Sequence, residues 1–252
     1  MPLMHQQDVS AALRSASRAH SGARGRIAWM IASFGVVQSI VCGLSALPIV
    51  LLWQALLGVL PDGLPTLLAI SVLALPSYGV FAIVLMAISA VTLRLLGWQT
   101  PRDSQMRLAD FDWPVLNWAR SMAALHVVRV LAGSLYRASP VWTTYLRWSG
   151  ARIGRRGYVA SLALSDYNLL EFGDDVVIGA DVHLSGHTVE EGMVKTAGVR
   201  LGRGVTIGLG SVIDIGVQIG DGCQVGALSL VPKGARLQPG AVYVGRPVRR
   251  VR

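Results

Sequence analysis

The feature that most constrains this chain is a hexapeptide repeat that runs from Leu201 towards the C-terminus. An aliphatic or aromatic residue returns at every sixth position, and a smaller residue lies two positions before each one. The large residues are Leu201, Ile207, Ile213, Ile219, Val225, Val231, Leu237 and Tyr243. The smaller residues are Val199, Val205, Ser211, Val217, Cys223, Ser229, Ala235 and Ala241.

A period of six fits neither an α-helix nor a simple strand. It predicts an all-β domain, a parallel β-helix in which each six-residue unit forms one side of a coil. We expect the large residue of each unit to fill the interior, with the smaller residue beside it. A glycine follows four of the large residues, and we expect it to tolerate the turn.

The repeat starts before Leu201 and is interrupted once. Ile153, Phe172, Ile178 and Leu184 carry the same pattern, but Leu201 then comes seventeen positions after Leu184. We therefore expect residues 185–198 to leave the coil as an insertion.

The predicted insertion contains candidate functional groups. Loops that project from a rigid solenoid are frequent places for function. This one holds His187 and two adjacent carboxylates, Glu190 and Glu191. It is the first place to look for a site.

The N-terminal part of the chain has a different character. Between Ile27 and Leu93 the only charged residue is Asp62, which lies in a turn-like run rich in proline and glycine. A membrane-spanning helix needs about 20 apolar residues, so this stretch predicts a transmembrane hairpin with helices over 27–60 and 65–93. The alternatives are a buried soluble core, or a signal peptide for the first segment, which is too long for one.

The flanking cations set the expected orientation. Four arginines precede the first helix, three follow or end the second, and the connecting turn has no lysine or arginine. These are Arg14, Arg18, Arg24 and Arg26 before the hairpin, and Arg94, Arg102 and Arg107 after it. The positive-inside rule then predicts a multi-pass protein of the inner (cytoplasmic) membrane with both termini in the cytoplasm.

Composition divides the chain in the same way. All seven tryptophans precede residue 150, and the segment between hairpin and repeat predicts a membrane-proximal helix over 115–135. The net charge of +9 suits an anionic bilayer surface. Nucleic acid is the rival partner of a basic chain, and we exclude it because no aromatic-basic recognition motif accompanies the spans. Cys42 and Cys223 are not expected to form a disulfide.

We divide the chain into four parts. These are a basic N-terminal segment (1–26), a two-helix transmembrane hairpin (27–98), a membrane-proximal helical linker (99–149) and the β-helix domain (150–252).

The repeat, the loop with its histidine, and the closing segments 227–234 and 244–247 resemble the hexapeptide-repeat acyltransferases. The resemblance implies a left-handed β-helix, a homotrimer, and acyl-CoA bound between subunits as co-substrate, with no bound cofactor. The ending departs from the family pattern, because Arg246 stands where asparagine is usual and Val248 where alanine is usual.

A longer stretch, including 145–155, 166–170 and the insertion, resembles the C-terminal region of non-ribosomal peptide synthetases of the poly-lysine synthetase type. In those enzymes membrane helices alternate with soluble regions. The resemblance implies a terminal unit without adenylation or carrier domains, and it leaves open a donor presented on a carrier protein.

Acyl transfer from a thioester to a hydroxyl or amine needs a base that takes the proton of the acceptor. Histidine suits this role because its pKa lies near the working pH. The family places a histidine on such a loop, and His187 is the matching residue. We expect Glu190 or Glu191 to orient its imidazole. The alternative is that His187 is a solvated loop residue.

A second histidine, His183, precedes an interior position, so its side chain should point outward. The pair raises the possibility of a zinc enzyme, but a catalytic zinc site normally needs three protein ligands. The repeat contains only these two histidines. We therefore predict no metal site.

Cations near the C-terminus suit the phosphates of coenzyme A. We name Lys233, Arg246 and Arg249 as candidate donor-binding residues, with Arg236 and Arg250 nearby. The alternative is a basic tail that touches lipid headgroups.

The sequence thus predicts an acyltransferase held at the membrane, which moves an acyl group, of acetyl type, to a membrane-proximal acceptor. The alternative is a non-catalytic scaffold, or a terminal unit of a membrane-associated peptide synthetase system.

Overall fold

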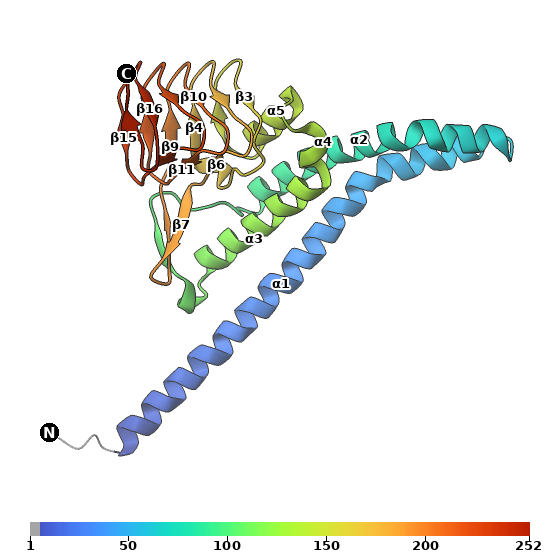
Figure 1. Cartoon of the computed structure of the whole chain (residues 1–252). Coiled ribbons are helices and arrows are strands. Elements are labelled where there is room, and N and C mark those ends of the chain that lie inside the picture. The colour runs from blue at the N-terminus through green and yellow to red at the C-terminus, as the bar shows by residue number, and fades with distance from the viewer. Residues whose placement is uncertain (1–5) are drawn as a thin grey trace.

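The computed structural model describes residues 6–252, and the side chains of residues 22–252. It consists of a long helical arm joined to a β-helix (Figure 1). The side chains of Arg14 and Arg18, two of the cations used to orient the hairpin, lie outside the described part.

The arm is an antiparallel pair of helices. Helix α1 (Gln6–Leu57) and helix α2 (Leu64–Leu95) are joined by a short turn that contains Asp62. The predicted hairpin is present, and α1 begins inside the segment assigned to a separate basic N-terminus. Many apolar side chains of the arm face outward, and Trp29, for example, is 63% exposed.

The linker after the arm is mostly helical. Strand β1 (Gln105–Arg107) and a 3-10 turn η1 (Leu108–Asp110) lead into α3 (Trp113–Val128). A π-helical turn, η2 (Arg129–Gly133), then connects α3 to α4 (Ser134–Tyr136). The helix predicted over 115–135 is therefore present, interrupted by this turn.

Helix α5 (Pro140–Trp148) closes the N-terminal end of the β-helix. Ser139 caps the N-terminus of this helix, and its hydroxyl accepts a hydrogen bond from the Trp142 amide. Trp142, Tyr145 and Leu146 are fully buried against the first coils, and the Trp142 indole donates to the Ser161 carbonyl (3.2 Å). The helix thus covers apolar surface that an end coil would otherwise expose.

The β-helix is built from three parallel sheets. One contains β2 (Arg152–Ile153), β4 (Leu170–Phe172), β9 (Val199–Leu201), β12 (Gln218–Ile219) and β15 (Arg236–Leu237). A second contains β3 (Tyr158–Val159), β5 (Val177–Ile178), β10 (Thr206–Ile207), β13 (Gln224–Val225), β16 (Val242–Val244) and an antiparallel final strand, β17 (Arg249–Arg250). The third contains β6 (His183–Leu184), β11 (Val212–Ile213) and β14 (Leu230–Val231).

The register confirms the period read from the sequence. Ile207 pairs with Val225 and Ile213 pairs with Val231, so one coil takes eighteen residues, or three hexapeptides. All eight large residues of the repeat are buried, and so is nearly every smaller residue two positions before them. The parallel β-helix is therefore confirmed, while its left-handed sense stays a prediction.

The glycines after the large residues have a different role from the one predicted. The turn positions with positive φ are occupied by another set, such as Gly204 and Gly210. A Cβ at Gly220 would instead lie 2.6 Å from the backbone nitrogen of Pro239 in the next coil. These glycines allow the close approach of successive coils, a need that the period alone did not reveal.

Candidate active site

The predicted insertion is a β-hairpin that projects from the coil. Strand β7 (His187–Glu190) pairs with β8 (Met193–Thr196), and β8 pairs in turn with β1 from the linker. The hairpin and β1 together form a three-stranded antiparallel sheet. This sheet joins the β-helix to the segment that follows the arm (Figure 1).

His187 is the first residue of β7, and its imidazole meets a buried carboxylate. Nδ1 lies 2.5 Å from Oδ2 of Asp166. A carboxylate can only accept a hydrogen bond, so Nδ1 carries the proton and Nε2 is left with the lone pair. The His187 side chain is 23% exposed, whereas that of Asp166 is fully buried.

The surroundings hold Asp166 as an acceptor. The Thr100 hydroxyl donates to Oδ1 (2.6 Å), and the Gly186 amide donates to Oδ2 (3.1 Å). The Ser165 hydroxyl lies 3.1 Å from Oδ2. Burial alone would raise the pKa of Asp166, but the hydrogen bond and the charge of His187, with the hydrogen bonds from Thr100 and Ser165, outweigh it and leave the pKa below its usual value. The carboxylate is thus charged and fixed in place.

Trp118 covers the other side of the imidazole. Its ring centroid lies 5.0 Å from that of His187, and the two planes meet at 73°. Trp118 comes from α3, so a residue of the helical linker contacts the hairpin histidine. Its indole Nε1 is buried and has no hydrogen-bond partner among the described residues.

The structure brings neither Glu190 nor Glu191 into contact with His187 among the described residues, and Asp166 occupies the position beside the imidazole that was expected of them. Glu190 forms ion pairs with Lys233 and with Lys195 (3.5 Å). Glu191 lies at the hairpin turn with a positive φ of 51°. Glu190 is the last residue of β7 and Glu191 follows it, whereas Asp166 contacts His187, the first residue of the strand.

The sequence analysis missed the contact between Asp166 and His187. The spacing in the sequence carried a signal, because Asp166 precedes Ser185 by nineteen residues, which is close to the length of one coil. The structure places these two side chains 3.4 Å apart, next to His187. Trp118 and Thr100 were missed because their positions depend on how the linker packs.

His183 lies on β6 and is exposed, as predicted from its position before interior Leu184. Among residues 22–252, no group of three or more histidine, cysteine or acidic side chains could hold a metal ion. The candidate site therefore consists of His187 and Asp166 with the residues around them.

The predicted donor-binding cations have different partners in the structure. Lys233 is paired with Glu190, and Arg246 donates to the Leu228 carbonyl (2.6 Å). Arg249 lies on exposed β17.

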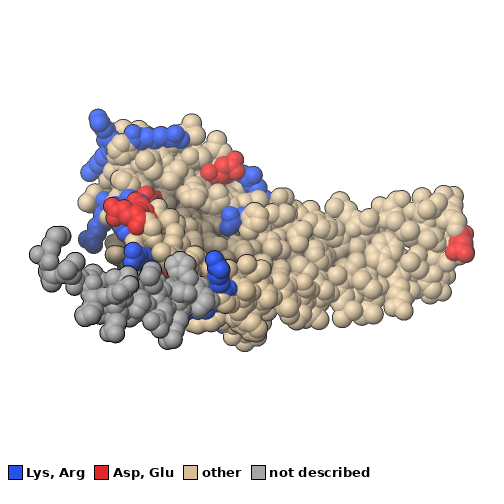
Figure 2. Space-filling model, turned by 90° about the horizontal axis from the view of Figure 1, so that it is seen from below, with Lys and Arg blue, Asp and Glu red and all other residues tan. Residues whose placement is uncertain are grey.

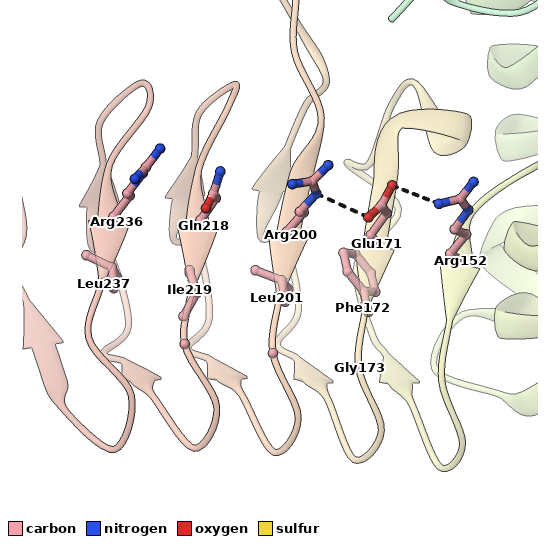
Figure 3. A pocket seen from close by; sticks show the side chains of 12 residues that line it. Arg152, Glu171, Phe172, Gly173, Arg200, Leu201, Gln218, Ile219, Arg236 and Leu237 are labelled. Carbon is pink, nitrogen blue, oxygen red and sulfur yellow. Dashed lines mark hydrogen bonds and ion pairs between the residues drawn. The ribbon is translucent and has the colours of Figure 1, made fainter.

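A row of polar side chains instead lies along the outer face of the sheet that contains β2 and β15. Arg152, Glu171, Arg200, Gln218 and Arg236 line a groove of about 570 Å³ (Figure 3). Glu171 accepts from both Arg152 and Arg200, at 3.2 Å each. This row has a surplus of positive charge and could meet phosphates of a donor.

Comparison with solved structures gives neighbours that share the β-helix. They include a hexapeptide transferase family protein from Anaplasma phagocytophilum (21% identity, TM-score 0.33), which covers 40% of this chain and 54% of its own length. A hexapeptide-repeat containing acetyltransferase from Vibrio cholerae, complexed with acetyl coenzyme A, has 19% identity and a TM-score of 0.37 and covers 44% of this chain and 74% of its own.

Galactoside acetyltransferase in complex with coenzyme A has 23% identity and a TM-score of 0.40, with 53% of this chain and 78% of its own covered. No protein-family model matches the sequence, and no curated protein matches it. The expected resemblance to poly-lysine synthetases receives no support from these comparisons.

Proposed function

We propose that the chain is an acyltransferase in which His187 acts as general base and Asp166 as its positioning residue. The observation that carries the proposal is the 2.5 Å contact between His187 Nδ1 and a buried, charged Asp166. This contact fixes the tautomer that leaves Nε2 free to accept a proton.

In the proposed reaction, Nε2 takes the proton of an acceptor hydroxyl or amine as its oxygen or nitrogen attacks the thioester carbonyl. The tetrahedral intermediate collapses with cleavage of the C–S bond. The thiolate leaves with the proton returned by the imidazolium, and the acyl group stays on the acceptor. Asp166 stabilises the transient positive charge on the ring, and backbone amides of the coils are the candidates for stabilising the oxyanion.

The proposed donor is acyl-CoA, with an acetyl-type group. The arginine row of Figure 3 supports a phosphate-bearing donor because guanidinium groups bind phosphates by charge-assisted hydrogen bonds. Lys233, Arg246 and Arg249 remain proposed contacts, and we propose a homotrimer in which a neighbouring subunit completes the donor site. A carrier protein is the alternative source of the thioester.

We further propose that the arm spans the membrane and holds the β-helix at its cytoplasmic face. The segments Gly22–Leu57 and Leu64–Leu95 each contain an 18-residue stretch with a mean hydropathy of 2.2. Their side chains face outward, and in Figure 2 the arm shows no charge between the β-helix end and its far tip. An apolar surface of this extent is stable in lipid rather than in water.

The test is ligand-dependent stability combined with transfer. Protein in lipid nanodiscs is unfolded thermally with coenzyme A, acetyl-CoA or a long-chain acyl-CoA. A ligand at about 100 times its Kd adds roughly 2.7 kcal/mol. We expect one donor to stabilise both the wild type and His187→Ala, and the substitution to abolish transfer.

The matched control is His183→Ala, which removes an exposed histidine from the neighbouring strand and should leave transfer intact. If no thioester donor stabilises the protein and His187→Ala changes nothing, the chain is a non-catalytic scaffold.

A further inference from the structure

An apolar pocket lies between the arm and the linker, next to the candidate base. Its volume is about 460 Å³, within the usual range of roughly 300–1,000 Å³ for ligand sites. It is lined by Ile27 and Met30 of α1, by Leu108, Ala109 and Phe111 around η1, and by Val115, Leu116, Trp118 and Ala119 of α3.

Polar contacts at both ends keep the pocket open. At one end, Arg26 of α1 donates to the carbonyls of Phe111 (3.0 Å) and Asp110 (3.1 Å). At the other, the buried Arg120 of α3 donates to the Ser33 hydroxyl of α1 (2.6 Å). The Arg120 guanidinium also lies over the Trp98 and Trp113 rings. These contacts hold α1 and α3 apart at a fixed spacing, so the pocket is preformed.

Trp118 joins the pocket to the candidate active site. It lines the pocket, and the same indole contacts the imidazole of His187 at a centroid distance of 5.0 Å. The pocket and the candidate base are therefore in contact with the same side chain.

The position of the pocket indicates what enters it. Ile27 and Met30 lie where the uncharged stretch of α1 begins, just after Arg24 and Arg26. In a membrane-spanning arm this is the level of the cytoplasmic lipid headgroups. The lining side chains offer no polar group except the Trp118 indole, which suits a hydrocarbon chain better than a peptide, whose backbone would need partners.

Resting on the proposed function, we propose that this pocket holds the hydrocarbon chain of a lipid acceptor, whose hydroxyl or amine is thereby presented to His187. The donor approaches from the β-helix side, where the arginine row lies, and the acceptor from the membrane side. The substrate class is an amphipathic lipid rather than a free sugar or a soluble amine.

The test is photolabelling of the full chain in phosphatidylcholine nanodiscs with a long-chain alkylamine that carries a diazirine. We expect cross-links on the pocket residues of α1 and α3. Ala119→Phe fills the pocket from α3 and should reduce this labelling at least tenfold. The matched control Ala123→Phe, one turn along α3 and outside the pocket, should leave it unchanged.

Two results would overturn the acceptor assignment. One is labelling spread along the exposed spans and insensitive to Ala119→Phe. The other is labelling of the pocket by a photoreactive acyl-CoA tail but not by the alkylamine, which would make the occupant the donor's chain.

The proposed function is separable from this inference. His187→Ala should keep pocket labelling while it loses transfer. In a series of alkylamine acceptors with acetyl-CoA, KM should fall with each added methylene, by up to roughly fourfold. Transfer that is independent of chain length would leave the base in place and remove the lipid pocket.

Discussion

At the scale of single residues, the candidate site depends on one proton. The buried Asp166 accepts from His187 Nδ1, and the amide of Gly186 and the hydroxyl of Thr100 occupy other positions around the carboxylate. A fixed carboxylate selects one tautomer of the imidazole. Basicity at Nε2 is therefore a property of the pair rather than of the histidine alone.

Asp166→Asn tests this pairing. The amide can donate to Nδ1, which places the proton on Nε2 and removes the base. We expect kcat to fall by about 10²- to 10⁴-fold, the range of general-base effects. Asp181→Asn is the control, because Asp181 is exposed and pairs only with Arg137 among the described residues. Retained activity in Asp166→Asn would show that the carboxylate is not the positioning group.

The depressed pKa of Asp166 predicts a pH dependence of stability. A carboxyl with a lowered pKa in the folded state stabilises above its unfolded pKa, close to the usual 3.8. That contribution is lost as the pH falls through the lower folded value. The difference in unfolding temperature between wild type and Asp166→Asn should therefore persist at pH 5 to 7 and shrink only below about pH 4. A difference that disappears between pH 6 and pH 4.5 would mean that burial raises this pKa instead.

At the scale of elements, the β-helix depends on close contact between successive coils. A Cβ at Gly220 would meet the backbone nitrogen of Pro239 at 2.6 Å, and one at Gly173 would meet that of Arg203 at 2.7 Å. Backbone atoms cannot move aside as a flexible side chain can. These strands therefore tolerate no methyl group at such positions without separating.

Gly220→Ala is expected to destabilise the β-helix by about 1–3 kcal/mol, the usual cost of overpacking. Gln218→Ala, an outward-facing change on the same strand, should stay within about 0.5 kcal/mol. Thermal unfolding of both variants measures the difference. Equal stability of the two would show that the coils can separate to admit a methyl group.

The elements of the β-helix were largely predictable, and the contacts of the site were not. The six-residue phase identified every interior position from Leu201 onward, and its single break located the hairpin that carries His187. The carboxylate that pairs with His187 could not be identified from the sequence, because it depends on which residue of the neighbouring coil lies beside the imidazole. Trp118 lies far earlier in the sequence, and only the packing of α3 against the hairpin brings it to the imidazole.

At the scale of the whole molecule, charge separates the two parts. Charged side chains gather on the β-helix and its adjoining helices, and the arm is apolar as far as its tip (Figure 2). Asp62 lies in the turn at that tip. This separation of charge supports the proposal that the arm lies in lipid and the β-helix in water.

Topology can be tested with introduced cysteines. Asp62→Cys at the tip and Arg252→Cys at the C-terminus should face opposite sides of the membrane, because the positive-inside rule keeps the basic end in the cytoplasm. A membrane-impermeant maleimide on intact cells should label Asp62→Cys and should reach Arg252→Cys only after lysis. Labelling of both from outside, or of neither, would contradict a spanning hairpin. The wild type is the control, since Cys223 is buried and Cys42 is within the arm.

Because each coil repeats the one before it at the same register, eighteen residues can be added to or removed from the C-terminal half without shifting the rest. His187, Asp166 and Trp118 all belong to the coils and helices nearest the arm. If the arm spans the membrane as proposed, a longer or shorter solenoid would keep the proposed reaction centre at the same height above the bilayer. Chains of the same design could then differ in length by whole coils and still meet the same layer of the membrane.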